Sequence, residues 1–319
     1  MRPLVVVLGA SGFIGSAVAR ALARQPVRLR LVARRPAPSP VDPVADIEVC
    51  AADLTAPGVL AGAVAGADTI VHLVAYTEGG WRVADGDAVA ERINVGLVRD
   101  LIDVLAGFDR APAVLFAGTD TQVGLTAHDR IDGTEPDRPR CAYSRHKLTA
   151  ETLLKRATAA GVLRAVSLRL PTVYGHGPDS TADDRGVVAF MVRRALAGHD
   201  LTMWNDGSVR RDFVYIDDVT AAFTAAAAHV EALAGAHWLI GTGTGEPLGK
   251  VFTAIAELVA RHTGRPPAPV VSIPPPPHAE PTDLKSVEID STAFRTVTGW
   301  QPRIPLHEGL RRTVTAIAG

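Results

Sequence analysis

A tyrosine and a lysine four residues apart are the first residues in this sequence whose types suggest chemistry. Tyr143 and Lys147 lie in a segment with a helical pattern, where side chains four residues apart share one face. A phenol alone has a pKa of about 10 and carries protons poorly at neutral pH, but a neighbouring ammonium is expected to lower that pKa. We therefore predict an acid/base pair that serves hydride transfer at a carbinol or carbonyl carbon.

A hydroxyl group upstream is the second candidate for chemistry. Thr119 follows an apolar run, and Asp120 and Thr121 come directly after it. Ligands of parallel sheets bind at the carboxyl ends of the strands, so Thr119 is predicted to hydrogen-bond the reacting oxygen. The alternative is a threonine that only caps a helix or forms a turn.

A glycine-rich turn near the N-terminus indicates a dinucleotide. It follows an apolar run and opens a helical pattern, which is where a pyrophosphate binds to backbone N–H groups at a helix N-terminus. The alternative is a plain strand-to-helix turn whose glycines serve packing. The predicted cofactor contacts of this turn are Gly9, Ser11, Gly12, Phe13, Ile14 and Gly15.

The end of the second predicted strand indicates which dinucleotide binds. An acidic residue there holds the ribose 2′-hydroxyl of NAD, whereas a basic one accommodates the 2′-phosphate of NADP. Here the strand ends in Arg34 and Arg35, with no acid. We therefore predict NADP (as NADPH), with NAD as the alternative cofactor if both arginines are only solvated surface residues.

The elements that must position these residues alternate between short apolar runs and helical patterns, as in βαβ units. We predict an α/β protein with a Rossmann-type doubly wound parallel sheet and a smaller C-terminal substrate-binding domain. The NAD(P)-binding domain is expected to span residues 1–172, with 208–244 returning to it, and 173–319 to be mainly substrate-binding. Strands are expected at 4–8, 29–33, 47–50, 69–73, 113–117 and 165–170, and helices at 12–24, 88–106, 143–159, 187–197 and 248–262.

The composition argues against several other classes of protein, among them nucleic-acid-binding, membrane and disulfide-rich proteins. The net charge of −1 over 319 residues favours neither a nucleic-acid nor a membrane-surface partner. The two cysteines, Cys50 and Cys141, lie far apart, so neither a disulfide framework nor a metal site is expected. The N-terminal apolar run is too short for a secretion signal or a membrane span, and a cytoplasmic protein is expected.

Taken together, these patterns resemble the extended short-chain dehydrogenase/reductases, the family of NAD-dependent epimerases and dehydratases of nucleotide sugars. The similarity extends over nearly the whole chain. Besides the glycine turn and the Tyr/Lys pair, the motifs that carry it are Asp53-Leu54, His72-Leu73-Val74-Ala75, Asn94-Val95, Thr119, Arg169-Leu170-Pro171, Val173-Tyr174-Gly175, Arg211-Asp212-Phe213-Val214, Asp217-Asp218-Val219 and Gly299-Trp300-Gln301-Pro302.

The resemblance implies further roles. It makes Thr119, Tyr143 and Lys147 a catalytic triad, with Lys147 also holding the nicotinamide ribose. The cofactor contacts that it adds are Asp53 and Leu54 beside the adenine, and Ala75 and Pro171 along the cofactor. The implied substrate contacts are Asp120, Thr121, Thr172 and Arg211, the last of which would grip the diphosphate. Asp53 as a helix cap and Arg211 as a surface ion-pair partner are the alternatives, and His72 is expected to be a packed, hydrogen-bonded core histidine.

Departures from the family pattern narrow the reaction. Thr121 stands where the dehydratases have a glutamate, and threonine is no general base, so dehydration is not expected. Val123 and Thr172 also depart from common family residues that bind the sugar. With NADPH as cofactor, these features favour a 4-ketoreductase that acts on a dTDP-4-keto-6-deoxyhexose in deoxysugar biosynthesis.

Three alternatives stay open at this point. They are a nucleotide-sugar 4-epimerase with tightly bound NAD, a carbonyl reductase of steroid or flavonoid type, and a non-catalytic NADP sensor. The resemblance also implies a homodimer, joined through the helices expected at 88–106 and 143–159.

Overall fold

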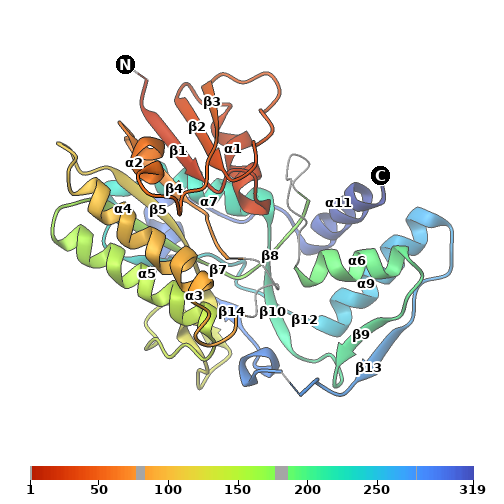
Figure 1. Cartoon of the computed structure of the whole chain (residues 1–319). Coiled ribbons are helices and arrows are strands. Elements are labelled where there is room, and N and C mark those ends of the chain that lie inside the picture. Colours follow the sequence, from red (N-terminus) through yellow and green to blue (C-terminus); the bar gives the residue numbers. More distant parts are fainter. Residues whose placement is uncertain (1, 77–82, 177–185, 278) are drawn as a thin grey trace.

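A seven-stranded parallel sheet forms the centre of the protein (Figure 1). The computed structural model describes residues 2–76, 83–176, 186–277 and 279–319. The order 3-2-1-4 within the sheet reverses direction beside β1, as in Rossmann-type folds, and confirms the expected fold class. From one edge to the other, the strands are β11 (His237–Leu239), β7 (Arg164–Leu170), β5 (Ala113–Thr119), β4 (Thr69–His72), β1 (Leu4–Leu8), β2 (Arg28–Ala33) and β3 (Asp46–Ala51).

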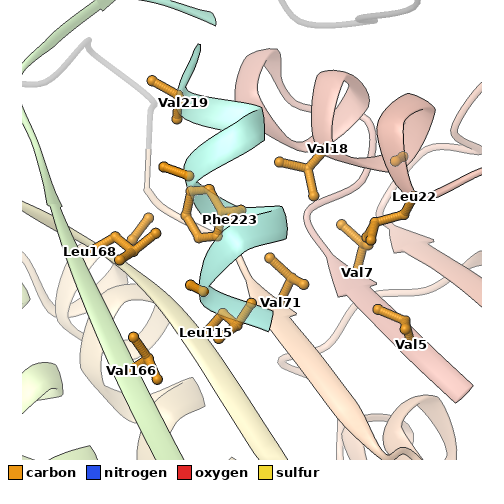
Figure 2. Packing of buried hydrophobic residues seen from close by; sticks show 14 of the residues in the cluster. Val5, Val7, Val18, Leu22, Val71, Leu115, Val166, Leu168, Val219 and Phe223 are labelled. Carbon is orange, nitrogen blue, oxygen red and sulfur yellow. The ribbon is translucent and has the colours of Figure 1, made fainter. Parts of the chain in front are cut away.

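Helices cover both faces of this sheet because its central strands are apolar on both sides. On β1, Val5 and Val7 face one layer, whereas Leu4, Val6 and Leu8 face the other. The first layer contains α1 (Phe13–Leu22) and α7 (Ile216–Ala228), and Figure 2 shows Val18 and Phe223 from these helices packed over the strands. The second layer consists of α2 (Val59–Val64), α4 (Leu97–Leu105) and α5 (Ala142–Ala159).

The helix predicted over 88–106 is interrupted in the structure. It begins as α3 (Ala88–Glu91), passes through a π-helical turn at Arg92–Gly96 and continues as α4. Such a turn holds one extra residue, so it changes the direction of a side chain within an otherwise regular helix. Asn94 lies in this turn and is buried.

Two segments from the second half of the chain join the central layers. The α7 helix packs against α1, and β11 pairs with β7 in parallel, with His237 opposite Ser167. The short α8 (Val230–Leu233) connects them.

The remaining C-terminal elements form a separate layer beside the sheet (Figure 1). Its core lies between α6 (Val187–Leu196), α9 (Leu248–Thr263) and α11 (Leu306–Ala318). The other small elements of the chain, in this layer or outside it, are the strands β6 (Arg130–Ile131), β8 (Thr172–Tyr174), β9 (Leu201–Trp204), β10 (Arg210–Tyr215), β12 (Gly245–Pro247), β13 (Val270–Ile273) and β14 (Glu288–Ile289), the helix α10 (Thr292–Thr298), and 3-10 turns at Asp120–Val123 and Pro281–Leu284.

The small strands link this layer to the central sheet. The chain continues from β7 through Pro171 into β8, which pairs with β10 in a three-stranded sheet. Among the described residues, no helix combines the length and the hydropathy that crossing a bilayer requires.

Candidate active site

The glycine turn after β1 has a shape that only glycine allows. Gly9 has a φ of +89°, and a Cβ at Gly15 would lie 2.0 Å from the carbonyl oxygen of Gly9. The α1 helix then begins after Gly12, which has no side chain to cap it, so this residue leaves the first N–H groups of the helix uncapped. A negatively charged pyrophosphate fits this cradle.

The other predicted residues of this turn lie around that cradle. Ser11, Phe13 and Ile14 are partly buried, and the last two pack against the C-terminal core. Their side chains therefore fix the start of α1, which leaves the backbone of the turn to contact a ligand.

The two arginines lie at the end of β2, as predicted. Arg34 and Arg35 are exposed and directly follow the strand. Asp53, which follows β3, accepts hydrogen bonds from the backbone and hydroxyl of Thr55, at 2.9 and 2.7 Å, and these bonds lower its pKa together with the charge of Arg34. Asp53 thus forms a local turn next to the arginines, and Leu54 is buried beside it.

The segment that contains Ala75 follows β4, the neighbour of β1. Ala75 is partly buried, and the next residue, Tyr76, donates a backbone hydrogen bond of 2.8 Å to the side chain of Asn94. The π-helical turn aims Asn94 at this segment. Asn94 is a motif residue to which the sequence assigned no role, and the structure makes it the anchor of the strand end.

Tyr143 and Lys147 share one face of α5, as predicted, and the Lys147 Nζ lies 5.8 Å from the centre of the Tyr143 ring. Lys147 is buried, donates a 2.8 Å hydrogen bond to the carbonyl of Ala117, and has a pKa lowered by burial to about 8. This ammonium also lies over the ring of Phe116. It is therefore directed at the end of β5 as well as at the phenol.

The expected direction of the Tyr143 pKa shift is wrong for this structure. Desolvation of the phenol raises its pKa, and the negative charge of Asp120 raises it further. These effects outweigh the ammonium, whose hydrogen bond goes to a backbone carbonyl. Tyr143 thus stays protonated over the physiological pH range.

His72 ends β4 close to this group. Its ring is buried against Phe116, and burial lowers its pKa to about 4, so it is neutral. Its Nδ1 has no hydrogen-bond partner within the described part of the chain, which differs from the hydrogen-bonded histidine that we expected.

Thr119 is the last residue of β5, and it begins a chain of hydroxyl contacts. Its hydroxyl donates to Asp120 at 3.2 Å and lies 3.0 Å from that of Thr121, which in turn lies 2.6 Å from the hydroxyl of Ser144 on α5. Burial raises the pKa of Asp120 to about 6 despite the nearby charge of Arg211. Thr121 therefore joins the strand end to the helix of Tyr143, a contact that the sequence did not suggest.

Arg211 lies at the start of β10, close enough to Asp120 for their charges to interact. Both of its Nη atoms donate to backbone carbonyls, those of Arg210 and Lys285 from Nη1 and those of Thr282 and Asp283 from Nη2, at 2.5 to 3.1 Å. Among the described residues Arg211 forms no surface ion pair, which was the alternative for it; the side chain fixes the 282–285 loop.

The two remaining predicted residues lie at the same end of the central sheet, beyond its carboxyl-terminal edge. Pro171 and Thr172 follow β7, the neighbour of β5, and both are partly buried. Thr172 pairs with Phe213 of β10, so it lies one strand away from Arg211.

The sequence analysis did not identify two buried residues of the site, Gln122 and Glu151. Gln122 accepts a hydrogen bond from the Thr119 backbone N–H and donates one to Glu151, each at 3.0 Å. The spacing from Thr119 to Gln122 matches a capping box, a Ser or Thr followed three residues later by Glu or Gln, and this pattern could have identified Gln122 from the sequence.

Across the described ranges, no group of three or more His, Cys, Asp or Glu side chains has the arrangement of a metal site.

Comparison with known proteins places this site in context. The model of the NAD dependent epimerase/dehydratase family matches residues 5–241, which confirms the resemblance inferred from the motifs. The UDP-glucose 4-epimerase of Mycolicibacterium smegmatis is 31% identical over 222 residues, 67% of each chain. The dTDP-6-deoxy-L-talose 4-dehydrogenase (NAD(P)(+)) of Kitasatospora kifunensis is 28% identical over 317 residues, covering 98% of this chain and 95% of that protein.

A solved structure is similar to this chain in fold. MoeE5 in complex with UDP-glucuronic acid and NAD is 26% identical, with a TM-score of 0.81 over 98% of each chain.

Proposed function

Because the chain belongs to the NAD dependent epimerase/dehydratase family, we propose that it reduces the C4 keto group of a dTDP-4-keto-6-deoxyhexose with NADPH. The observation that carries this proposal is Tyr143, a phenol that desolvation and the charge of Asp120 keep protonated. A protonated phenol suits the reduction of a ketone, in which the new alkoxide must receive a proton. The relative that aligns over 98% of this chain is named for dehydrogenation at position 4 of a dTDP-6-deoxyhexose, which supports the same carbon and sugar class.

The residues act on the carbonyl oxygen in this reaction. NADPH, when bound, supplies the hydride that C4 receives. Tyr143 gives its proton to the C4 oxygen, and the Thr119 hydroxyl hydrogen-bonds and orients the same oxygen. Lys147, an ammonium below its pKa of about 8, stabilises the tyrosinate that proton transfer leaves behind. The ketone thereby gains one hydride and one proton and becomes an alcohol.

On the substrate side, Asp120, Thr121, Thr172 and Arg211 are the proposed contacts. The two Nη groups of Arg211 already bond carbonyls of the 282–285 loop, so a diphosphate must replace some of these acceptors to be gripped by it. Substrate binding would then be coupled to a rearrangement of this loop.

Cofactor choice is tested at Arg34 and Arg35. Replacing both with alanine should weaken NADPH binding at least about 100-fold, since charge-assisted hydrogen bonds to a phosphate are each of the order of 1.5–3 kcal/mol and two are lost. NADH binding should change less than twofold. Equal losses for both cofactors, or a clear preference of the wild-type protein for NADH, would contradict the NADP assignment.

The reaction itself is tested by following NADPH oxidation with dTDP-4-keto-6-deoxyhexoses as substrates. One NADPH should be consumed per ketosugar reduced. Tyr143→Phe should lower kcat by about 10²- to 10⁴-fold, the range for general acid catalysis, while NADPH still binds. A variant with a near-normal rate would refute the role of the phenol.

A nucleotide-sugar 4-epimerase with tightly bound NAD is the second candidate. The 31% identity to a UDP-glucose 4-epimerase favours it. In that case the chain would turn over its substrate without added cofactor, and NAD would remain bound during purification. Mass spectrometry of the purified protein separates the two candidates.

Three further expectations stay predictions. They are the carbonyl reductase of steroid or flavonoid type, which loss of dTDP binding would favour, the homodimer through α4 and α5, and the cytoplasmic location.

A further inference from the structure

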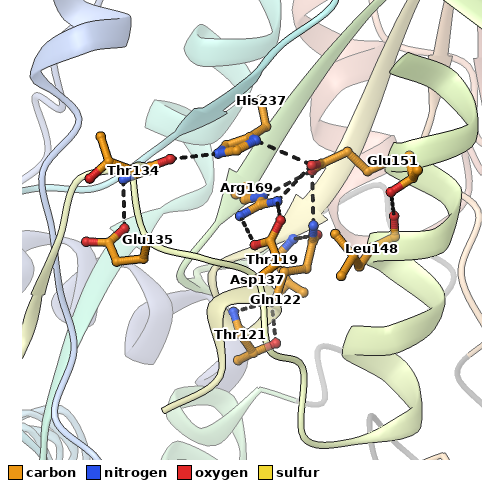
Figure 3. Close-up of polar contacts among 12 residues, drawn as sticks. Thr119, Thr121, Gln122, Thr134, Glu135, Asp137, Leu148, Glu151, Arg169 and His237 are labelled. Atoms are coloured by element: carbon orange, nitrogen blue, oxygen red, sulfur yellow. Dashed lines mark hydrogen bonds and ion pairs between the residues drawn. The ribbon is translucent and has the colours of Figure 1, made fainter. Parts of the chain in front are cut away.

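Gln122 links the strand end of the site to the helix of the site. Its side chain is 0% exposed, and it has one acceptor and one donor contact (Figure 3). The Oε1 accepts from the backbone N–H of Thr119, and the Nε2 donates to Oε2 of Glu151, both at 3.0 Å. Glu151 lies on α5, one helical turn beyond Lys147. One side chain thus connects the two elements that carry the proposed catalytic residues.

The far end of this link is itself fixed. The buried Glu151 receives hydrogen bonds from Arg169 at 2.8 and 3.1 Å and from Lys155 at 2.7 Å. Arg169 is 0% exposed and forms a two-pronged ion pair with Asp137, at 2.7 and 2.8 Å. Burial alone would raise the pKa of Glu151, but hydrogen bonds from His237 and Arg169 hold it below its usual value. Glu151 is therefore a permanently charged acceptor with little freedom to move.

Gly118 provides the space for this contact. A Cβ at Gly118 would lie 2.9 Å from Oε1 of Gln122 and 3.2 Å from Cγ of Arg169. Both atoms belong to buried side chains, and Oε1 is the acceptor for Thr119. A larger residue at position 118 would therefore push Gln122 away from the amide that it holds.

We propose that Gln122 is a positioning residue, which sets the place of Thr119 relative to Tyr143 through its bonds to the Thr119 amide and to Glu151. The inference rests on the proposed function, in which Thr119 and Tyr143 act on the same oxygen. Displacement of about 1 Å in such a group can slow a reaction on the order of 10²-fold, so a buried amide that fixes the backbone of Thr119 has a direct effect on rate.

Gln122→Met tests this role, because methionine fills a similar volume and makes neither hydrogen bond. We expect kcat to fall about 10-fold or more, with KM for the ketosugar and the Kd for NADPH within about twofold of wild type. The deuterium isotope effect with cofactor labelled at the transferred position should rise, since the chemical step becomes slower. Asp137→Asn is the matched control: it weakens the same charged cluster but does not contact Thr119, so its kcat should stay within about twofold of wild type.

A second variant guards against a folding defect. Gln122→Glu keeps the shape and the acceptor for Thr119, but a carboxylate cannot donate to Glu151. Burial and the charge of Glu151 raise the pKa of the new carboxyl, so kcat relative to wild type should be low at alkaline pH and recover as the pH falls and this carboxyl gains a proton. Absence of this recovery would count against the proposal.

Hydrogen exchange separates this inference from the proposed function. If the wild-type protein does not reduce a dTDP-ketosugar, the proposed function has failed, but exchange still tests the link. Backbone amides of residues 119–123 should exchange faster in Gln122→Met than in wild type or Asp137→Asn. Unchanged exchange, or equal losses of kcat in Gln122→Met and Asp137→Asn, would overturn the positioning role.

Discussion

The cofactor edge of the large sheet is built from backbone contacts between chain neighbours, whereas the C-terminal loops are held by buried charged side chains. At the cofactor edge, Gly9 and Gly15 are six residues apart, and their close approach creates the cradle. In the C-terminal loops, the carboxylate of Asp212 accepts from the backbone N–H groups of Thr242, Gly243 and Ile289, at 2.9 to 3.2 Å.

Two other charged side chains of the C-terminal region follow the pattern of Asp212. Arg211 donates hydrogen bonds to backbone carbonyls of the 282–285 loop. Asp218 accepts hydrogen bonds from the backbone N–H groups of Arg303 and Ile304, at 2.9 and 3.0 Å. Each of these side chains joins segments that are 70 or more residues apart. A loop held in this way depends on a few buried groups, while the glycine turn depends on the absence of side chains.

The largest expected effect comes from adding one methyl group to the glycine turn. In Gly15→Ala the Cβ would lie 2.0 Å from the carbonyl oxygen of Gly9, and relieving this clash requires a costly shift of the backbone. We expect the Kd for NADPH to rise at least about 100-fold, since overpacking and displaced phosphate contacts add up to several kcal/mol. Fluorescence titration measures this.

Gly62→Ala is the control for that change. Nothing lies within 4 Å of its added Cβ, and alanine favours the α2 helix, so binding should be unchanged and stability slightly higher. Normal NADPH affinity in Gly15→Ala would show that the turn does not form the cofactor site.

A smaller effect, on stability, is expected for Asp212. Replacement by alanine leaves buried N–H groups of two loops without an acceptor, which costs about 3 kcal/mol in the free energy of unfolding. Urea denaturation measures this loss, while the Kd for NADPH should stay within about twofold. Asp217→Asn, a change at an exposed neighbour, should cost less than about 1 kcal/mol. If Asp212→Ala weakened the cofactor site as much as the loops, the two regions would not be separate.

The last effect appears only at higher pH and lies where the two regions meet, at Asp120. Its pKa is raised from 3.8 to about 6, so its carboxyl group favours the folded state below pH 4, and this contribution is lost as the pH rises through 6. Asp120→Asn stays neutral and keeps a hydrogen-bond acceptor for Thr119. The variant should therefore be more stable than wild type by up to about 3 kcal/mol above pH 6, and equal to it below pH 4. Equal stability at both pH values would mean that Asp120 is solvated.

The same comparison explains which features the sequence predicted. The glycine turn and the Tyr143/Lys147 pair are local patterns, and local spacing fixes their geometry through strand and helix periodicity. The partners of Arg211 and Asp212 lie far along the chain in irregular loops, for which no periodic pattern exists. The direction of the Tyr143 pKa shift could not be predicted from local spacing either, because it depends on desolvation and on Asp120, which the fold brings close to the helix. Gln122 lay between these cases: its capping-box spacing was visible, but its partner Glu151 was not.

The parallel pairing of β11 with β7 has a consequence for the synthesis of the protein. β7 ends at Leu170, and the strand that covers its edge begins only at His237. At translation rates of about 5–20 residues per second, the intervening 66 residues take roughly 3 to 13 seconds to emerge. During that interval the N–H and C=O groups along one side of β7 are open to strands of other nascent chains. On a crowded polysome, this edge is exposed to wrong pairing for that interval.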